Sequence, residues 1–207
     1  MIDHLVFAGP NLADAVDFIA ERLGEQPVPG GRHIGFGTAN YLLGLGERCY
    51  LEVIGPDPDD PAFEGERPFG INALSEPKLV AWASERTGLA EFVSRVRASG
   101  VELGEALPMS RETTDGQMLH WTLTLPQVNE SGDPQLKPFF IDWGATTHPA
   151  VALGGGLVIE ELRLLHPEHE VVQKALAILE LPALVTDGET PALEAVIATA
   201  NGPRTLS

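Results

Sequence analysis

Several features are scarce in this sequence of 207 residues, and each scarcity narrows the class of protein. The chain has one cysteine, Cys49, so no intramolecular disulfide can form, which fits a reducing compartment. Basic residues are few: 13 Lys and Arg stand against 30 Asp and Glu, and the formal net charge is −17. Nucleic acids and anionic membrane surfaces are bound through basic surfaces, so we expect neither as a partner.

Long apolar runs are also missing. No stretch approaches the ~20 apolar residues that a bilayer crossing needs. The segment MIDHLVFAG lacks the basic region and the long apolar run of a secretion signal. We therefore expect a cytoplasmic protein.

Several motifs of cofactor and hydrolase chemistry are absent as well. The sequence has no GxGxxG that opens a helix after a strand, no GxxxxGK[ST], no HExxH, no CxxC and no GxSxG. Nucleotide-dependent and serine-hydrolase chemistry therefore lack support, and we expect no nucleotide cofactor.

What the chain does have is a repeated order of predicted elements. Residues 2–8 are rich in strand formers. Residues 12–23 show apolar side chains at helical spacing, between Asn11, which can act as N-cap, and Gly24, which can end the helix. Strands punctuated by glycine are predicted to follow near residues 33–37, 39–45 and 49–54.

A second unit repeats this order. It comprises a strand over 79–84, a helix over 89–99 that Thr87 can cap, and strands near 108–114, 118–125 and 138–143. The segments LADAVDFIAERLG and LAEFVSRVRASG can be laid over each other, which indicates a repeated supersecondary unit.

We divide the chain accordingly, as one compact unit. The parts are a first βαβββ module over 1–56, an acidic, proline-rich connecting loop over 57–78, a second βαβββ module over 79–144, and a partial third βαββ unit over 157–207.

Two stretches of the first unit, DHLVFAGPNLADAVDFIAERLG and GGRHIGFGTANYLLGLGERCYLEVIGPDP, resemble the glyoxalase-like domain family. That family belongs to the vicinal oxygen chelate superfamily, which also includes bleomycin-resistance proteins and dioxygenases. SRETTDGQMLHWTLTLP and PFFIDWGATTHPA resemble the family's second half, so the resemblance covers nearly the whole chain. It implies an α+β fold in which paired βαβββ modules form a cupped mixed sheet around a site.

The resemblance also implies a divalent metal, such as Fe, Zn, Ni or Mn, held by a histidine on a module's first strand and a glutamate on its last. The matching residues are His4 and Glu52. Such a metal acts as a Lewis acid on neighbouring substrate oxygens. Two other interpretations stay open: His4 as a hydrogen-bonded structural histidine, and Glu52 as an ion-pair partner of Arg32 or Arg111.

The second module departs from this pattern. Its position equivalent to His4 falls at Val80 or Ala81, and its position equivalent to Glu52 falls at Ile141 or Asp142. The usual set of ligands from two modules is therefore incomplete, so the metal is held by a different set or is absent.

Two further histidines are candidates for a ligand or a catalytic base near neutral pH: His33 and His120. With His4 and Glu52, either would complete a set of two histidines and one carboxylate, which suits non-haem iron. The alternative is a histidine that satisfies a turn or meets solvent. We expect the apolar face of strand 118–125 to pack against the helices, and its other face, with His120, to line the cup or meet solvent.

Four residues are candidates for substrate binding. Arg111 can pair with a substrate carboxylate, Asn40 and Asp142 can form hydrogen bonds, and Trp143 can wall a pocket. For Arg111 the alternative is a salt bridge to Glu112 or Asp115. The remaining histidines are predicted to lie on the surface: His148, His166 and His169.

The leading hypothesis is a metal-dependent lyase, isomerase or dioxygenase that acts on a small oxygen-rich molecule. The rival is a metal-free protein that binds or sequesters a small molecule on the same fold. A third hypothesis is a dimerising or regulatory module without a ligand, and formation of a homodimer stays open. Fold alone does not decide among these, because sites are grafted onto folds.

Overall fold

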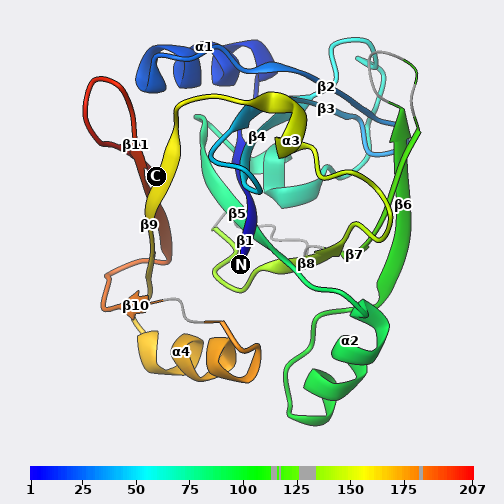
Figure 1. The fold of residues 1–207 in the computed structure, drawn as a ribbon, viewed down its shortest axis with the longest axis vertical. Helices are drawn as coiled ribbons and strands as arrows, with labels where there is room; N and C mark the ends of the chain where they lie inside the picture. The colour runs from blue at the N-terminus through cyan, green and yellow to red at the C-terminus, as the bar shows by residue number, and fades with distance from the viewer. Residues whose placement is uncertain (113–115, 117, 126–133, 182–183) are drawn as a thin grey trace.

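The computed structural model describes residues 1–112, 116, 118–125, 134–181 and 184–207, and its elements follow one another in three groups (Figure 1). The first group contains β1 (Ile2–Ala8), α1 (Leu12–Leu23), β2 (Val28–His33), β3 (Thr38–Gly44) and β4 (Tyr50–Pro56), followed by a 3-10 helix, η1 (Pro68–Ala73). The second contains β5 (Lys78–Glu85), α2 (Leu89–Ala98), β6 (Ala106–Glu112), β7 (Met118–Thr124) and β8 (Phe139–Asp142). After a short helix α3 (Ala150–Leu153), the third contains β9 (Val158–Leu165), α4 (His169–Ile178), β10 (Leu184–Thr186), β11 (Ala192–Ala198) and β12 (Arg204–Leu206).

Local signals set the limits of α1 as the sequence predicted. The Asn11 side chain accepts hydrogen bonds from the backbone N–H groups of Ala13 and Asp14, at 2.9 and 3.3 Å. Gly24 ends the helix in the left-handed conformation, with φ of 77°.

Two local predictions were wrong. The strand expected near 33–37 lies at 28–33 instead, because residues 34–37 form a turn with Gly35 and Gly37 at positive φ. The N-cap of α2 is Gly88, not Thr87. The N–H of Gly88 donates a hydrogen bond to the carboxylate of Asp142 at the end of β8.

The first two groups build one eight-stranded mixed sheet in the order β2-β3-β4-β1-β5-β8-β7-β6. The modules meet where β1 and β5 pair antiparallel, and each of these strands pairs in parallel with the last strand of its own module. The sheet curls until its two edges touch, and Arg111 on β6 donates a hydrogen bond to the carbonyl of Gly30 on β2. The α+β fold with a cupped mixed sheet is thus confirmed.

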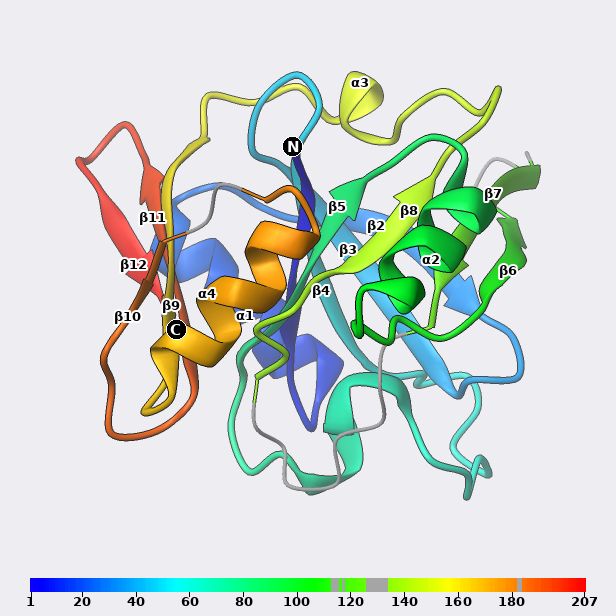
Figure 2. The ribbon, with the colours of Figure 1, turned by 90° about the horizontal axis from the view of Figure 1, so that it is seen from below.

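The third group is more complete than the predicted partial βαββ unit, since it has the full order β, α, β, β, β. Its separate four-stranded sheet has the order β10-β9-β11-β12, so β9, the first strand of the unit along the chain, lies in the interior of the sheet. In the first module the order is β2-β3-β4-β1, so β1, the first strand along the chain, lies at the end of the module's row of strands. This unit is therefore not a third copy of the same topology. Its sheet packs beside α1 on the convex face of the large sheet (Figure 2), and the N–H of Leu79 bonds the carbonyl of Ser207.

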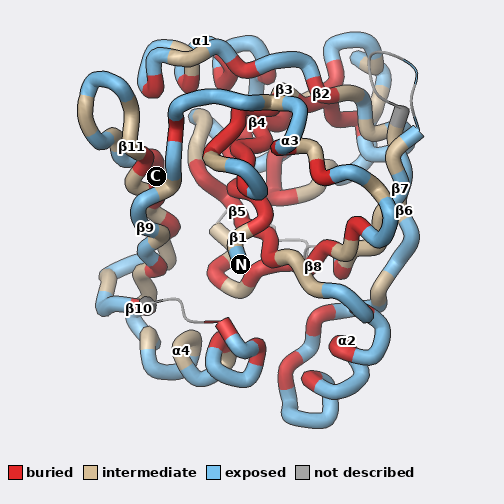
Figure 3. The backbone as a smooth tube through the Cα atoms, in the orientation of Figure 1, coloured by how far each residue is buried: buried red, intermediate tan, exposed pale blue. Residues whose placement is uncertain are grey.

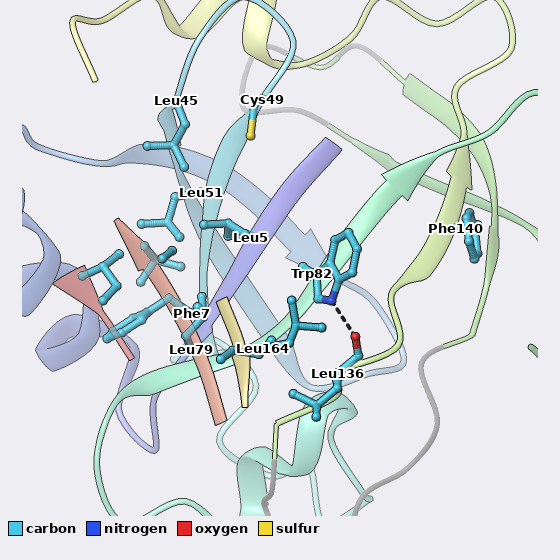
Figure 4. Close-up of a cluster of buried hydrophobic side chains, with 14 of the residues drawn as sticks. Leu5, Phe7, Leu45, Cys49, Leu51, Leu79, Trp82, Leu136, Phe140 and Leu164 are labelled. Carbon is cyan, nitrogen blue, oxygen red and sulfur yellow. Dashed lines mark hydrogen bonds between the residues drawn. The ribbon is translucent and has the colours of Figure 1, made fainter. Parts of the chain in front are cut away.

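Burial divides the large sheet into two faces, and its central strands are buried on both (Figure 3). On β1, Leu5 and Phe7 point to the convex face and join the apolar core that the helices and the small sheet share. Figure 4 shows this core, in which Trp82 Nε1 donates to the carbonyl of Leu136 over 2.9 Å. Cys49 belongs to it, and burial raises the pKa of its thiol to about 12, so it is a core residue.

The connecting segment contributes to the concave face. Phe69 and Ile71 of η1 are buried there, so residues 68–73 of the predicted connecting loop form a short helix that packs into the core. None of the helices in the described ranges is long and apolar enough to cross a membrane.

Candidate functional site

The concave face holds a pocket with about 890 Å³ of empty space, counting its open mouth. Its polar lining comes mainly from the first module: His4, His33, Thr38, Asn40, Tyr50 and Glu52, with Ser110 and Arg111 from β6. Its apolar lining comes largely from the second module and includes Met109, Trp121, Leu123, Phe139, Ile141 and Trp143. The polar side of the pocket is therefore formed mainly by the first module, which adds the apolar side chains of Ile34, Phe36, Leu42 and Ile54, and the apolar side mainly by the second.

Glu52 lies at the centre of the polar side, and its side chain is 10% exposed. Its Oε1 accepts a hydrogen bond from Asn40 Nδ2 at 2.6 Å and lies 3.8 Å from His33 Nε2. Its Oε2 lies 4.0 Å from His4 Nε2. The carboxylate is thus placed between two imidazoles, and each of its oxygens faces one of them.

The arginines considered as partners of Glu52 have other contacts. Arg32 pairs with Asp57 over 2.6 Å, and Arg111 is bonded to the carbonyl of Gly30. In the part of the chain that the structure describes, Asn40 is the one hydrogen-bond donor to Glu52.

Both imidazoles are held through Nδ1, which leaves Nε2 directed toward Glu52. His4 Nδ1 lies 2.6 Å from Asp3 Oδ1, and its ring stacks on Tyr50 with the centroids 4.6 Å apart. His33 Nδ1 lies 3.0 Å from Thr38 Oγ1, and Asn40 Nδ2 approaches His33 Nε2 to 3.4 Å. Because the Asn40 amide group is a donor, Nε2 of His33 carries the lone pair and Nδ1 the proton.

Electrostatics favours the neutral form of two of these groups. Burial lowers the pKa of His33, and the nearby Glu52 offsets only part of this effect. Burial also raises the pKa of Tyr50, so its phenol keeps its proton. A neutral His33 can accept a proton or bind a metal at neutral pH.

Two imidazole nitrogens and a carboxylate are chemically suitable metal ligands. Within the described ranges, however, no three His, Cys, Asp or Glu side chains stand as a formed metal-binding group. Ligand atoms that share a metal at about 2.1 Å lie roughly 3 to 4 Å apart. The separations of 3.8 and 4.0 Å run from the two histidines to different oxygens of Glu52, so the donor set fits a metal by chemical type and is not closed around one point.

Of the other predicted residues, Asn40, Arg111 and Trp143 line the pocket, whereas His120 and Asp142 lie outside it. His120 is exposed on the outer face of β7. Asp142 accepts hydrogen bonds from the N–H groups of Gly88, at the start of α2, and of Gly144, in the turn after β8, at 2.9 and 3.0 Å.

The expected orientation of strand 118–125 was wrong. Trp121, Leu123 and Leu125 line the pocket instead of packing against the helices. Alternation along β7 then turns His120 outward. The apolar face of β7 can line the pocket because this wall of the pocket is itself apolar.

The second module offers no equivalent of the His4 and Glu52 pair. Phe139 and Ile141 of β8 line the pocket, and Ala81 of β5 belongs to the same buried cluster. Among the pocket-lining residues that the structure describes, the ionisable side chains therefore belong to the first module, apart from Arg111 on β6.

Sequence reasoning missed a buried group behind His4. Asp3 is 1% exposed, and it accepts hydrogen bonds from His4, Trp143 and His148. The prediction that His148 lies on the surface was wrong, because this residue is 3% exposed. The one local signal was the acidic Asp3 inside an apolar strand.

A cupped sheet of two βαβββ modules around a half-polar pocket is the vicinal oxygen chelate fold. A family model described as "Glyoxalase-like domain" matches residues 2–180. The chain belongs to the glyoxalase-like domain family.

Several solved structures are similar in fold. A hypothetical protein from Staphylococcus aureus is 17% identical with a TM-score of 0.72, over 97% of this chain and 92% of that one. Methylmalonyl-CoA epimerase from Mycobacterium tuberculosis is 16% identical with a TM-score of 0.42, over 69% and 87%. A mutant of 4-hydroxymandelate synthase from Streptomyces coelicolor is 16% identical with a TM-score of 0.49, over 99% and 61%. A search of the curated proteins gave no match.

Proposed function

We propose that the protein is a metal-dependent enzyme that acts on a small, oxygen-rich molecule by lyase, isomerase or dioxygenase chemistry. The observation that carries this proposal is the arrangement around Glu52, whose two carboxylate oxygens face the Nε2 atoms of His4 and His33 at 4.0 and 3.8 Å. We assign these three residues as metal ligands. Two histidines and one carboxylate suit Fe(II), and the same donors bind Zn, Ni or Mn.

The state of Glu52 supports a cation at this place. A carboxylate out of water needs several hydrogen bonds or a positive charge. Glu52 has one donor, Asn40, in the described part of the chain, and no Lys or Arg there lies within ion-pair distance of it. A metal ion would supply the missing compensation.

When bound, the metal would act as a Lewis acid toward substrate oxygens. The protein's own residues bind and orient the substrate. Arg111 directs an always-charged guanidinium into the pocket lining, which suits an acidic group on the substrate. Trp121, Phe139 and Trp143 provide apolar lining against which a substrate would pack.

The second candidate function is metal-free binding or sequestration of a small molecule. One observation favours it: the second module presents Phe139 and Ile141 where the first presents polar groups. A pocket lined mainly by apolar side chains can bind a ligand without chemistry.

Elemental analysis tests between the two functions. The protein is purified without a histidine tag and without chelator, as wild type, Glu52→Gln and His120→Ala. We expect near-stoichiometric metal in wild type and in the matched control His120→Ala, whose ring lies outside the pocket, and loss of metal in Glu52→Gln. The proposal fails if wild type stays metal-free after reconstitution with Fe(II), Zn, Ni or Mn, and that result favours the binding function.

A further inference from the structure

Three buried hydrogen-bond donors meet at the carboxylate of Asp3, one from β1 and two from the segment between β8 and α3. His4 Nδ1 lies 2.6 Å from Oδ1, while Trp143 Nε1 and His148 Nε2 lie 2.9 and 3.1 Å from Oδ2. The side chains of Asp3, His4 and His148 are 0, 4 and 1% exposed. Trp143 directly follows β8, and His148 lies just before α3.

The hydrogen bonds determine where each proton lies. His148 Nδ1 accepts the N–H of Ala150 at 3.2 Å, so the ring proton of neutral His148 is on Nε2 and is donated to Asp3. Trp143 Nε1 can only donate. Oδ2 of Asp3 therefore accepts hydrogen bonds from Trp143 and His148, and Oδ1 is the oxygen that contacts His4.

Asp3 Oδ2 accepts two N–H groups, from Trp143 and His148, as a carboxylate oxygen does. A carboxylate has no hydrogen to donate, so Asp3 is an acceptor only. His4 must then donate through Nδ1. In the neutral ring, this leaves the lone pair on Nε2, the atom that faces Glu52 in the pocket.

We propose that Asp3, held in place by Trp143 and His148, is a positioning residue that fixes the Nδ1–H tautomer and the ring orientation of His4. The segment between β8 and α3 thereby controls a ligand that belongs to the first module. The part of this inference that concerns metal affinity rests on the proposed function of His4; the part that concerns the tautomer does not. A carboxylate behind a ligating histidine raises its basicity, and its removal costs about 10 to 100-fold in metal affinity.

The first test is long-range ¹H–¹⁵N NMR of the imidazole rings in metal-free protein, which identifies the protonated ring nitrogen. We expect His4 to carry its proton on Nδ1 and His148 on Nε2. In Asp3→Asn, we expect the proton of His4 to be distributed over both ring nitrogens. A proton on Nε2 of His4 in wild type, or an unchanged His4 in a folded Asp3→Asn protein, would overturn the proposal.

The second test compares two substitutions of His148 by competition titration with Zn²⁺. The amide of His148→Gln can still donate to Asp3, whereas His148→Phe removes the donor and keeps an aromatic ring. We expect near wild-type Zn²⁺ affinity for Gln and a roughly 10-fold loss for Phe. Equal losses in both variants with an unchanged His4 tautomer would show a purely structural role and refute the proposal. If wild type binds neither Zn²⁺ nor Fe(II), Ni or Mn in its place, the proposed function fails, and the tautomer measurement alone decides on Asp3.

Discussion

Asn40 donates a hydrogen bond to Glu52 across two neighbouring strands, with 2.6 Å between Nδ2 and Oε1. The contact depends on Gly30 of β2, because a Cβ atom at that position would lie 2.3 Å from Oδ1 of Asn40. A glycine in an edge strand thus makes room for the side chain that orients the central carboxylate. The sequence predicted Asn40 as a substrate-binding residue, and its present contact is with the proposed metal ligand.

Substitution Asn40→Ala is expected to destabilise the metal-free protein. It leaves the buried Glu52 without its donor in the described structure, which costs about 1 to 3 kcal/mol in the free energy of unfolding. The measurement is urea denaturation of wild type and variant after chelation. The double variant Asn40→Ala/Glu52→Gln is the control and should recover part of the loss, since no charge then stays buried. Equal stability of wild type and Asn40→Ala would contradict this account.

Substitution Arg111→Lys is expected to weaken binding of small carboxylates about 10-fold or more, because the planar guanidinium pairs with a carboxylate through two parallel bonds and an ammonium does not. Calorimetric titration with a series of carboxylates and their amides checks this. Arg97→Lys is the matched control, since Arg97 pairs with Glu102 and Glu105 away from the pocket. The same affinity in both variants would remove Arg111 from the binding site.

Two adjacent residues of β7 should behave in opposite ways. Trp121 lines the pocket and His120 is exposed on the other face. Trp121→Ala should abolish most of the thermal stabilisation that a bound ligand gives, and His120→Ala should keep it. Differential scanning fluorimetry with any ligand found in a screen provides the measurement. A larger effect at His120 would mean that the site lies on the outer face.

Acidification is expected to destabilise the metal-free protein partly through His33. Burial lowers the pKa of this residue in the folded state below its ordinary value of 6.5, so the unfolded chain takes up a proton that the folded chain does not. Its contribution is complete above pH 6.5 and is lost as pH falls from there toward the folded pKa. The free energy of unfolding should therefore fall less steeply between pH 7 and 5 in His33→Asn. If the free energy of unfolding depends on pH in the same way in the two proteins, the pKa of His33 is not lowered in the folded state.

The sequence was informative where the signal is local. Asn11, Gly24 and the spacing of apolar residues between them predicted α1, and the family resemblance predicted the cupped sheet. The orientation of β7 could not be predicted in this way, because an apolar face can pack against helices or line an apolar pocket. Alternation gives two faces and does not say which one is inside.

The group behind His4 was beyond local reasoning for another reason. His148 lies 145 residues from Asp3 along the chain, and the sequence around it, rich in turn formers, is typical of a surface segment. Only the tertiary structure places the segment between β8 and α3 next to Asp3 on β1. A contact of this kind leaves no periodic pattern in the sequence.

The division of the pocket into one polar and one apolar side has a stereochemical consequence. His4, His33 and Glu52 come from the first module, while Trp121 and Ile141 of the second module line the same pocket, and Phe139 packs edge to face against His4. A flat ligand would therefore meet the proton acceptors from the side of the first module. If the proposed chemistry creates a stereocentre at a trigonal carbon held there, we expect attack on one face and a product of one mirror-image form.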